Sequence, residues 1–378
     1  MSALTTDEQR AIDAARGFAA THVRPNVQAW EHGHGDSRSV LPEAARAGML
    51  GLEVPVEHGG QGLSFGCKWR VAEVLAAADF GVAMSVINTH NVANHLARKA
   101  APEVVRQYLP ALLSGRRTGC TALTEPGAGS DFSAIATQAR KVGDAWLIDG
   151  QKAWIVNATH ADVMVVYAQT EPGAGARGIA AFVVDGTRDG FVRDPRSDSG
   201  AARAADAGGF QLRAYRAQAH ELLHAPGQAF KAALTSINGA RIYVAAMCCG
   251  MVAECLRVAR EYGATRHTFG KSLHEHQGWR WSLADAAIDV EAARLLLDAA
   301  AARIDSGSDA QTAAAQAKVF ATRMAGRHIA ALLHAMGAQG LREHHPFLRH
   351  LAAAQVATLV DGSTEMLLER IAKDLRKL

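Results

Sequence analysis

The segment Thr121-Ala-Leu-Thr-Glu-Pro-Gly-Ala-Gly-Ser-Asp131 is the most informative stretch of the chain. Gly127 and Gly129 carry no side chain, so backbone N–H groups of this turn can approach a ligand closely. Thr124 and Ser130 add hydroxyl groups, which donate and accept hydrogen bonds. For a single pair of glycines the alternative is an ordinary turn at the entry to a strand. The whole segment predicts a ligand-binding turn.

Four further segments follow it along the chain: Gln151-Lys-Ala-Trp-Ile-Val-Asn157, Arg266-His-Thr-Phe-Gly-Lys-Ser-Leu-His-Glu-His-Gln277, His334-Ala-Met-Gly-Ala-Gln-Gly340 and Val360-Asp-Gly-Ser-Thr-Glu-Met366. In this order, and together with the glycine-containing turn, they resemble the acyl-CoA dehydrogenase family of FAD enzymes. The resemblance extends over the whole length of the chain. It is weakest at Asp361, where the family usually has glutamate.

Length and composition set the outer limits of the interpretation. The chain has 378 residues, which exceeds the roughly 250–300 residues of a single core and predicts two or three cores. Apolar residues make up 49% and charged residues 20%, as in globular proteins, and a net charge of +3 is too small to indicate nucleic-acid binding. The first residues lack an apolar signal core, and no uncharged apolar run reaches about 18 residues, so we expect no membrane span.

The five cysteines form no Cys-x-x-Cys pair, which argues against zinc and indicates reduced thiols in a cytoplasmic protein. His344, His345 and His350 lack a carboxylate or cysteine partner at ligand spacing, so we predict no metal site.

The sequence pattern changes twice. Helical periodicity covers residues 1–117 and returns over 226–378, with helices expected at 234–263, 282–306, 313–333 and 364–378. Residues 118–225 contain short β-rich runs, among them a strand that starts at Trp146 and enters an Asp149-Gly150 turn. Residues 194–209 are polar and small, which predicts an exposed or mobile loop. The expected fold is mainly α with a central β domain. The resemblance implies an N-terminal helical domain, a small β-barrel or sandwich and a C-terminal four-helix bundle.

The resemblance also implies which residues contact FAD. In the family the first turn lies against the flavin and the thioester arm of the substrate, so Leu123, Thr124 and Ser130 are predicted flavin contacts, with Ser130 also near the substrate. Trp154 would shield the flavin ring. Two residues on, the family has a hydroxyl group that bonds flavin N5, whereas this chain has Val156, which cannot donate. A backbone amide is the alternative donor.

Two segments of the helical region are expected at the rest of the cofactor. Arg266, Phe269 and Gln277 correspond to residues that reach the FAD diphosphate and adenine of a neighbouring subunit, and an arginine fork suits pyrophosphate. This implies a homo-oligomer, dimer or tetramer. The second segment contributes His334, Gly337 and Ala338, where His334 and Ala338 replace a glutamine and a glycine of the family. An ion pair common in the family is also replaced, by Ala352-Ala353.

Asp361 falls on the position of the catalytic glutamate of the family. α,β-Dehydrogenation needs a base for the α-proton and an acceptor for the β-hydride, and a dry pocket raises the pKa of such a base. Asp361 has the right chemistry but is shorter by one methylene, roughly 1.5 Å. Some members carry the base before a helical arginine; here Arg241 matches that arginine, but Ala240 precedes it. A substrate-orienting role or an ordinary Asp-Gly turn are the alternatives for Asp361.

The family pattern places further contacts around this aspartate. Arg241 and Gly362 are expected at the substrate, and Ser363 and Glu365 at the cofactor. The predicted reaction is FAD-dependent dehydrogenation of an acyl thioester bound to an acyl carrier protein or to CoA. The departures at Asp361, Val156, His334 and Ala352-Ala353 favour a biosynthetic role. Electrons would pass to an electron-transferring flavoprotein or another acceptor. A flavin monooxygenase or oxidase on the same fold and a flavin-free interaction protein are the alternatives.

Overall fold

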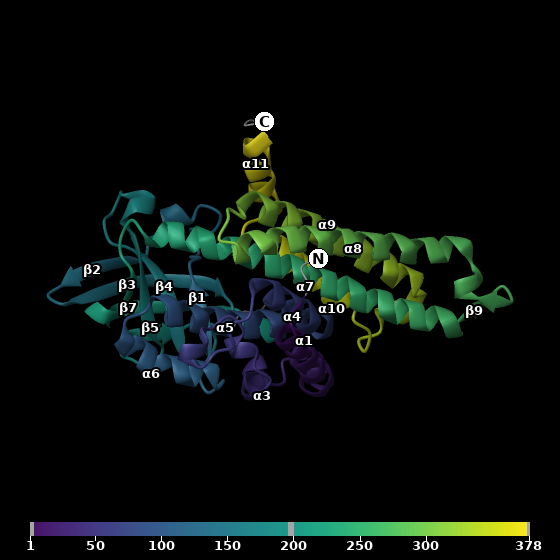
Figure 1. Ribbon diagram of the computed structural model, residues 1–378, viewed down its shortest axis with the longest axis horizontal. Helices are drawn as coiled ribbons and strands as arrows, with labels where there is room; N and C mark the ends of the chain where they lie inside the picture. Colours follow the sequence, from purple (N-terminus) through teal and green to yellow (C-terminus); the bar gives the residue numbers. More distant parts are fainter. Residues whose placement is uncertain (1–3, 196–199, 376–378) are drawn as a thin grey trace.

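The computed structural model describes residues 4–195 and 200–375, which form a helical part, a β part and a second helical part in chain order (Figure 1). The first part contains α1 (Thr6–Phe18), α2 (Val27–Glu31), α3 (Leu41–Arg46), α4 (Phe65–Ala78), α5 (Phe80–Lys99) and α6 (Pro102–Leu113). Thr5 and Glu8 form a capping box at the start of α1. Asp79 separates α4 from α5 because its carboxylate accepts a hydrogen bond from the Val82 amide at 2.8 Å.

The β part contains β1 (Gly119–Ala122), β2 (Gln138–Val142), β3 (Ala145–Ile155), β4 (Val163–Gln169), β5 (Ile179–Asp185), β6 (Phe191–Arg193), β7 (Gly208–Gln218) and β8 (Leu222–His224). They form one sheet in the order β6-β7-β3-β2-β4-β5-β8, and β1 pairs in parallel with β4. Within the described residues the end strands β6 and β8 do not pair, so the sheet is open. The expected barrel is therefore wrong, and a central sheet takes its place.

Two local predictions in this part are also wrong. Asp149-Gly150 is no turn, because β3 continues through it with a register shift between Ile148 and Gly150 against β7. The Asp149 carboxylate accepts a hydrogen bond from the Ala214 amide at 2.6 Å, which ties the bulge to β7. The Asp-Gly pair therefore forms a β-bulge within a long strand and not a turn between two strands.

The segment predicted as an exposed loop is partly buried. Residues 196–199 lie outside the described residues, but Ala204, Ala205 and Asp206 are buried against α5. A Cβ at Gly81 would lie 2.6 Å from the Ala205 amide nitrogen, so the close approach depends on a glycine in α5. Low hydrophobicity concealed this contact because small residues bury little side chain.

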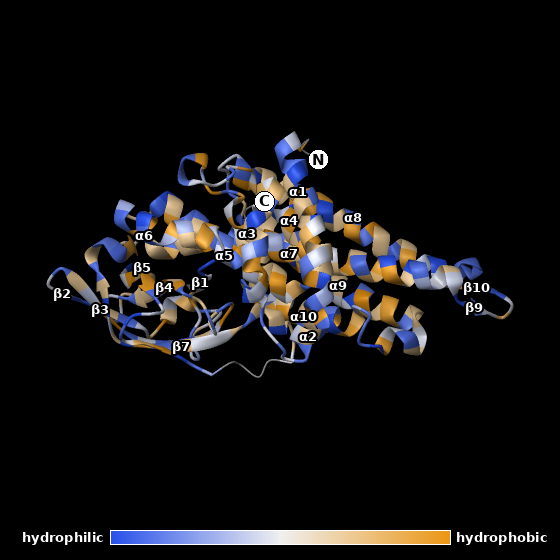
Figure 2. Cartoon of the chain, turned by 90° about the horizontal axis from the view of Figure 1, so that it is seen from below, coloured by the Kyte–Doolittle hydropathy of each residue, from blue (hydrophilic) through white to orange (hydrophobic). Residues whose placement is uncertain are grey.

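The second helical part contains α7 (Ala229–Thr265), α8 (Gln277–Asp305), α9 (Gln311–Ala335), α10 (Phe347–Leu359) and α11 (Thr364–Leu375). The four helices that the sequence predicted here are confirmed as α7, α8, α9 and α11, whereas α10 was not predicted. A short hairpin, β9 (His267–Thr268) and β10 (Lys271–Ser272), joins α7 to α8 at the end of the bundle farthest from the sheet (Figure 1). Hydropathy alternates around α8 and α9 in Figure 2, as in helices with one buried side. Within residues 4–195 and 200–375, α7 is the one helix long and apolar enough to cross a membrane, and 78% of its apolar window is buried within the protein.

Candidate active site

Asp361 lies in the tight connection between α10 and α11. Its backbone is left-handed with φ 54°, and Gly362 follows with φ 99°. Aspartate is one of the few residues with a Cβ that tolerates this region, and glycine has no side chain to clash. The side chain of Asp361 is half-buried. The connection therefore holds one carboxylate at a position set by the backbone.

Two cations from neighbouring helices hold this connection. Lys318 of α9, which is 1% exposed, donates hydrogen bonds from its ammonium to the Val360 carbonyl and, at 2.6 Å, to the Gly362 carbonyl. Arg241 of α7 donates from Nε to the Asp361 carbonyl at 3.1 Å. Three consecutive carbonyls are thus bound by side chains of α7 and α9, so Asp361 is anchored through its main chain.

The same cations set the electrostatics of the carboxylate. Burial raises the pKa of Asp361, and the charges of Lys318 and Arg241 oppose that rise. Burial also lowers the pKa of Lys318 to about 8, while the charge of Asp361 opposes the fall. A carboxylate with a raised pKa is a stronger proton acceptor than an exposed one, which suits a general base.

The glycine-containing turn is supported by a buried ion pair that the sequence did not reveal. Lys152 of β3 bonds the Glu125 carboxylate at 2.7 Å and the Leu123 carbonyl at 3.0 Å. The same carboxylate accepts hydrogen bonds from the amides of Ala136 at 2.6 Å and Thr137 at 3.0 Å. Burial lowers the pKa of Lys152 to about 8, and Glu125 opposes the fall. The turn is thus held in place by the ion pair of one lysine and one glutamate.

The upper side of this turn is open. Among the described residues no atom lies within 4 Å of a methyl group built at Gly127, and Ser130 is exposed. The Thr124 carbonyl accepts a hydrogen bond from the Ala153 amide at 3.1 Å, which places the turn beside the end of β3. Open space above unsubstituted backbone is what a bound ring requires.

Trp154 stands at the end of β3 with φ 61° and 70% of its surface exposed. Val156 is half-buried and packs against the largest hydrophobic cluster. Asn157 is buried with φ 66°, and its amide donates to the carbonyls of Ser85 at 3.1 Å and Gly119 at 3.0 Å. Because Asn157 anchors the strand end to α5 and β1, the indole of Trp154 is presented to solvent beside the turn.

The residues expected at the cofactor diphosphate lie elsewhere. Phe269 and Gly270 form the turn of the β9–β10 hairpin, both with positive φ, and Phe269 is 97% exposed. Arg266 and Gln277 are exposed at the two ends of the hairpin segment, and no ion pair of Arg266 is found within the described residues. An exposed aromatic ring beside a free cation is suited to a partner outside this chain.

His334, Gly337 and Ala338 are exposed at the same end of the bundle. Trp279, near the start of α8, donates to the Ala335 carbonyl at the end of α9 at 3.1 Å, which joins the two helix ends. Gly337 has φ 59°, a conformation that glycine adopts without strain. The fourth sequence segment and the hairpin therefore belong to one surface.

The predicted residues thus fall into two groups. The first group lies near the sheet and the α10–α11 connection: Leu123, Thr124, Ser130, Trp154, Val156, Arg241, Asp361, Gly362, Ser363 and Glu365. The second group lies at the far end of the bundle: Arg266, Phe269, Gln277, His334, Gly337 and Ala338 (Figure 1). Ser363 accepts a long hydrogen bond of 3.5 Å from the Met366 amide at the start of α11, and Glu365 is exposed there. One chain does not bring the two groups together.

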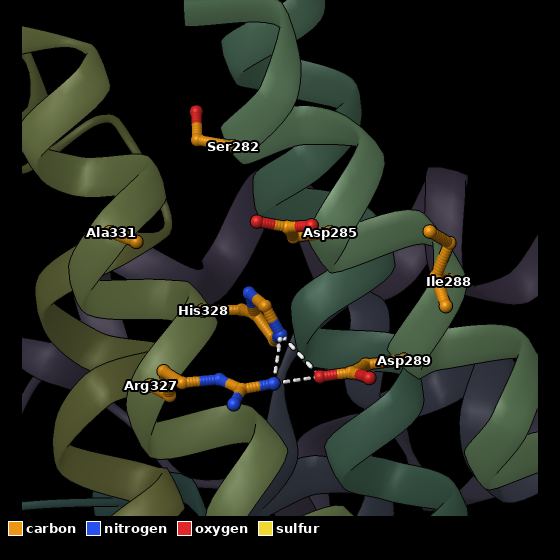
Figure 3. Close-up of a pocket in the computed structure, with 7 residues that line it drawn as sticks. All are labelled: Ser282, Asp285, Ile288, Asp289, Arg327, His328 and Ala331. Carbon is orange, nitrogen blue, oxygen red and sulfur yellow. Dashed lines mark hydrogen bonds and ion pairs between the residues drawn. The ribbon is translucent and has the colours of Figure 1, made fainter. Parts of the chain in front are cut away.

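Other polar features lie apart from both groups. A pocket of about 410 Å³ between α8 and α9 contains Asp289, which bonds His328 Nε2 at 2.7 Å and also pairs with Arg327 (Figure 3). All five cysteines are buried and free. No cluster of three metal-ligating side chains occurs among residues 4–195 and 200–375.

Lys318 was missed by sequence reasoning, although it left a signal. It lies four residues after buried Ala314 and three before buried Ala321, on the apolar side of α9. A lysine at a core position of a helix is rare and requires a buried partner. That partner, the α10–α11 connection, is not predictable from the helix alone.

Comparison with known proteins identifies the family of this chain. The chain matches the family models of the acyl-CoA dehydrogenase N-terminal domain at residues 5–116, middle domain at 120–214 and C-terminal domain at 227–376. It is 32% identical to the short/branched chain specific acyl-CoA dehydrogenase of Rattus norvegicus over 98% of this chain and 86% of that one.

Two solved structures extend the comparison. Butyryl-CoA dehydrogenase from Megasphaera elsdenii superposes with a TM-score of 0.95 at 29% identity over 99% of both chains. A glutaryl-CoA dehydrogenase from Mycobacterium smegmatis, solved in complex with FADH2, superposes with a TM-score of 0.92 at 26% identity over 99% of this chain and 96% of that one.

The fold and the comparisons thus define a flavin-dependent oxidoreductase that acts on CH–CH bonds, with FAD as its cofactor. The chain belongs to the acyl-CoA dehydrogenase family. Its own residues fit the cofactor: the open turn at Gly127 and the exposed Trp154 suit the flavin, and the exposed Arg266 suits the diphosphate.

Proposed function

We propose that the protein removes two hydrogens from an acyl thioester in a biosynthetic pathway, with Asp361 as the base. The observation that carries this proposal is the anchored carboxylate: Asp361 lies between Lys318 and Arg241, and burial raises its pKa. Ala240 offers no alternative base beside Arg241.

The chemistry that the chain supplies is proton transfer and positioning. The Asp361 carboxylate takes the α-proton as the Cα–H bond breaks, and the electron pair of that bond enters the new Cα–Cβ double bond. Bound FAD supplies the acceptor for the hydride that leaves Cβ. The Asp361 backbone N–H is the donor that the chain supplies to the thioester carbonyl. Negative charge develops on the carbonyl oxygen during the reaction and strengthens this hydrogen bond. Lys318 and Arg241 fix the main chain of the Asp361 connection and thereby position its carboxylate for the substrate Cα.

The carrier of the acyl group is the finer part of the proposal. The departures at Asp361, Val156, His334 and the Ala352-Ala353 pair distinguish this chain from the usual family pattern. They favour an acyl group on a carrier protein over a free acyl-CoA. Electrons would leave through an electron-transferring flavoprotein or a similar acceptor, as the family resemblance implies.

Homo-oligomerisation follows from the separation of the two residue groups. The β9–β10 hairpin, which carries Phe269, lies at the end of the bundle farthest from the sheet that contains β3 (Figure 1). Trp281, Ile288 and Leu295 are exposed at seven-residue spacing along α8, which forms an apolar stripe typical of helix interfaces. We propose that one subunit completes the FAD site of another.

The test is anaerobic absorbance of the FAD-loaded protein mixed with acyl groups on CoA and on a carrier protein. Wild type, Asp361→Asn and Asp144→Asn are compared, since Asp144 is exposed in the turn between β2 and β3. Bleaching by an acyl thioester that Asp361→Asn loses and Asp144→Asn keeps would support the reaction and show the carrier. A protein that holds FAD and is bleached by no thioester would refute dehydrogenation and favour the oxygenase.

A further inference from the structure

A buried polar cluster occupies the helices beside Asp361. Glu53, Lys68, His90, Asn91 and Tyr243 come from the loop before α4, from α4, from α5 and from α7. Lys68, His90 and Tyr243 are buried, and Tyr243 is 6% exposed. Replacing buried ion pairs with apolar side chains is often neutral or stabilising, so stability alone does not explain such a cluster.

The members contact one another in series. Lys68 pairs with Glu53, which also bonds His90 Nε2 at 3.2 Å. The Lys68 ammonium lies 3.3 Å from the Asn91 amide oxygen, and the Asn91 amide nitrogen donates to the Tyr243 hydroxyl at 3.3 Å. The series therefore runs from the N-terminal part to the phenol of Tyr243.

The phenol of Tyr243 belongs to the helix that holds the Asp361 connection. Tyr243 is two residues after Arg241 in α7, and Arg241 bonds the Asp361 carbonyl. Burial raises the pKa of Tyr243, and the charge of Asp361 raises it further, so the two groups interact electrostatically. The polar cluster thus ends on α7, two residues after the arginine that holds the Asp361 connection.

Two donors of the cluster remain available. A lysine ammonium has three N–H donors, and within the described residues Glu53 and Asn91 accept two of them, while the ammonium also lies 4.5 Å from the Phe65 ring centroid. The Tyr243 hydroxyl accepts from Asn91 but has no acceptor for its own proton among those residues. Donors without acceptors in a buried site are suited to an oxygen atom of a ligand.

We propose that the substrate carries a hydrogen-bonding, uncharged oxygen on its acyl group, which Tyr243 and its neighbours Asn91 and Lys68 receive. The inference rests on the proposed dehydrogenation at Asp361. Glu53 balances the charge of Lys68, and burial lowers the pKa of His90 so that it stays neutral, which favours a hydroxyl over a carboxylate. An all-carbon acyl group would leave these buried donors unpaired.

The test compares two acyl groups of equal size, 4-hydroxybutyryl and pentanoyl, each on CoA and on a carrier protein. Anaerobic bleaching gives the rate for each, as the α-proton passes to Asp361 and the β-hydride to FAD. We expect wild type to favour 4-hydroxybutyryl by about tenfold in kcat/KM, the size of one net hydrogen bond. Tyr243→Phe should bring this ratio close to one, and Asn91→Ala should lower it.

Tyr262→Phe is the matched control, because Tyr262 is half-buried in the same helix. A ratio that Tyr262→Phe keeps and Tyr243→Phe loses would support the inference. A wild-type preference for pentanoyl, or for glutaryl as a charged probe, would overturn the inference and leave dehydrogenation standing. No bleaching by any of these thioesters would count against dehydrogenation itself, and the inference would fall with it.

Discussion

Lys318→Met should reduce the rate of flavin bleaching much more than it reduces stability. Methionine keeps the length of the side chain but removes the hydrogen bonds to the carbonyls of Val360 and Gly362. The connection that carries Asp361 then loses its anchor to α9, while Arg241 still holds one carbonyl. The carboxylate should move relative to the substrate.

The magnitudes follow from the burial of Lys318. Two half-buried carbonyls without partners cost on the order of 1–3 kcal/mol each. Against this, burial lowers the pKa of Lys318 from 10.5 to about 8, so removing its charge recovers about 3 kcal/mol at 1.36 kcal/mol per pKa unit. The cost of about 2–6 kcal/mol and the recovery of about 3 kcal/mol largely cancel, so the free energy of unfolding should change by no more than about 3 kcal/mol. A displacement of 1 Å at the base costs on the order of 100-fold in rate.

The pH dependence provides a second readout. Asp361 must be deprotonated to accept the α-proton, and the charge of Lys318 opposes the rise of its pKa. Without Lys318 the pKa of Asp361 rises further, so the acid limb of the rate moves to higher pH. Stopped-flow bleaching from pH 5 to 9 measures both effects, with Lys231→Met as control because Lys231 is exposed on α7. A Lys318→Met rate and acid limb equal to those of wild type would refute the reasoning.

Three further predictions follow from the same contacts. Arg266→Ala should lower the FAD content of the purified protein, measured by absorbance, since its exposed guanidinium suits the diphosphate; full occupancy would contradict this. Glu254→Gln should lower the thermal midpoint at pH 7 but not near pH 2, because Arg24 and Arg257 hold the pKa of Glu254 at about 2 instead of 4.5. That stability, about 2 kcal/mol after discounting the partly exposed arginines, is present above pH 4.5 and is lost as the pH falls toward 2. Lys152→Met should lower the free energy of unfolding by about 3–5 kcal/mol because it leaves the buried Glu125 carboxylate without its cation. A thermal midpoint equal to that of the same substitution at an exposed lysine of β2 would count against this role of the ion pair.

The sequence predicted the order of helical and β parts because periodicity is a local property. Long helices such as α8 and α9 were located within five residues at each end. The Asp149-Gly150 bulge was read as a turn because the same dipeptide suits both, and only the pairing of β3 with β7 distinguishes them.

The site was predictable only where the chemistry is local. Gly127 and Asp361 lie in short segments with a recognisable order of residue types. Lys318 bonds a carbonyl that lies 42 residues later in the chain. Lys152 bonds one that lies 29 residues earlier. Sequence patterns in one element do not show which distant loop a buried charge will meet. A lysine at a buried position was the only signal, and it does not indicate which segment supplies the partner.

The anchored backbone also bears on the shorter reach of Asp361. Because φ is 54° at this residue, the direction of its Cβ is set by a conformation that few side chains tolerate. Lys318 and Arg241 bond the main chain on both sides, so the side chain adds only two rotatable bonds to a fixed origin. A glutamate there would add a third and lose more conformational entropy when it is held in place. An aspartate can therefore serve as a base if the substrate α-carbon comes about one bond length closer, and a small polar acyl group held at Tyr243 is the kind of ligand that can be drawn in by that distance.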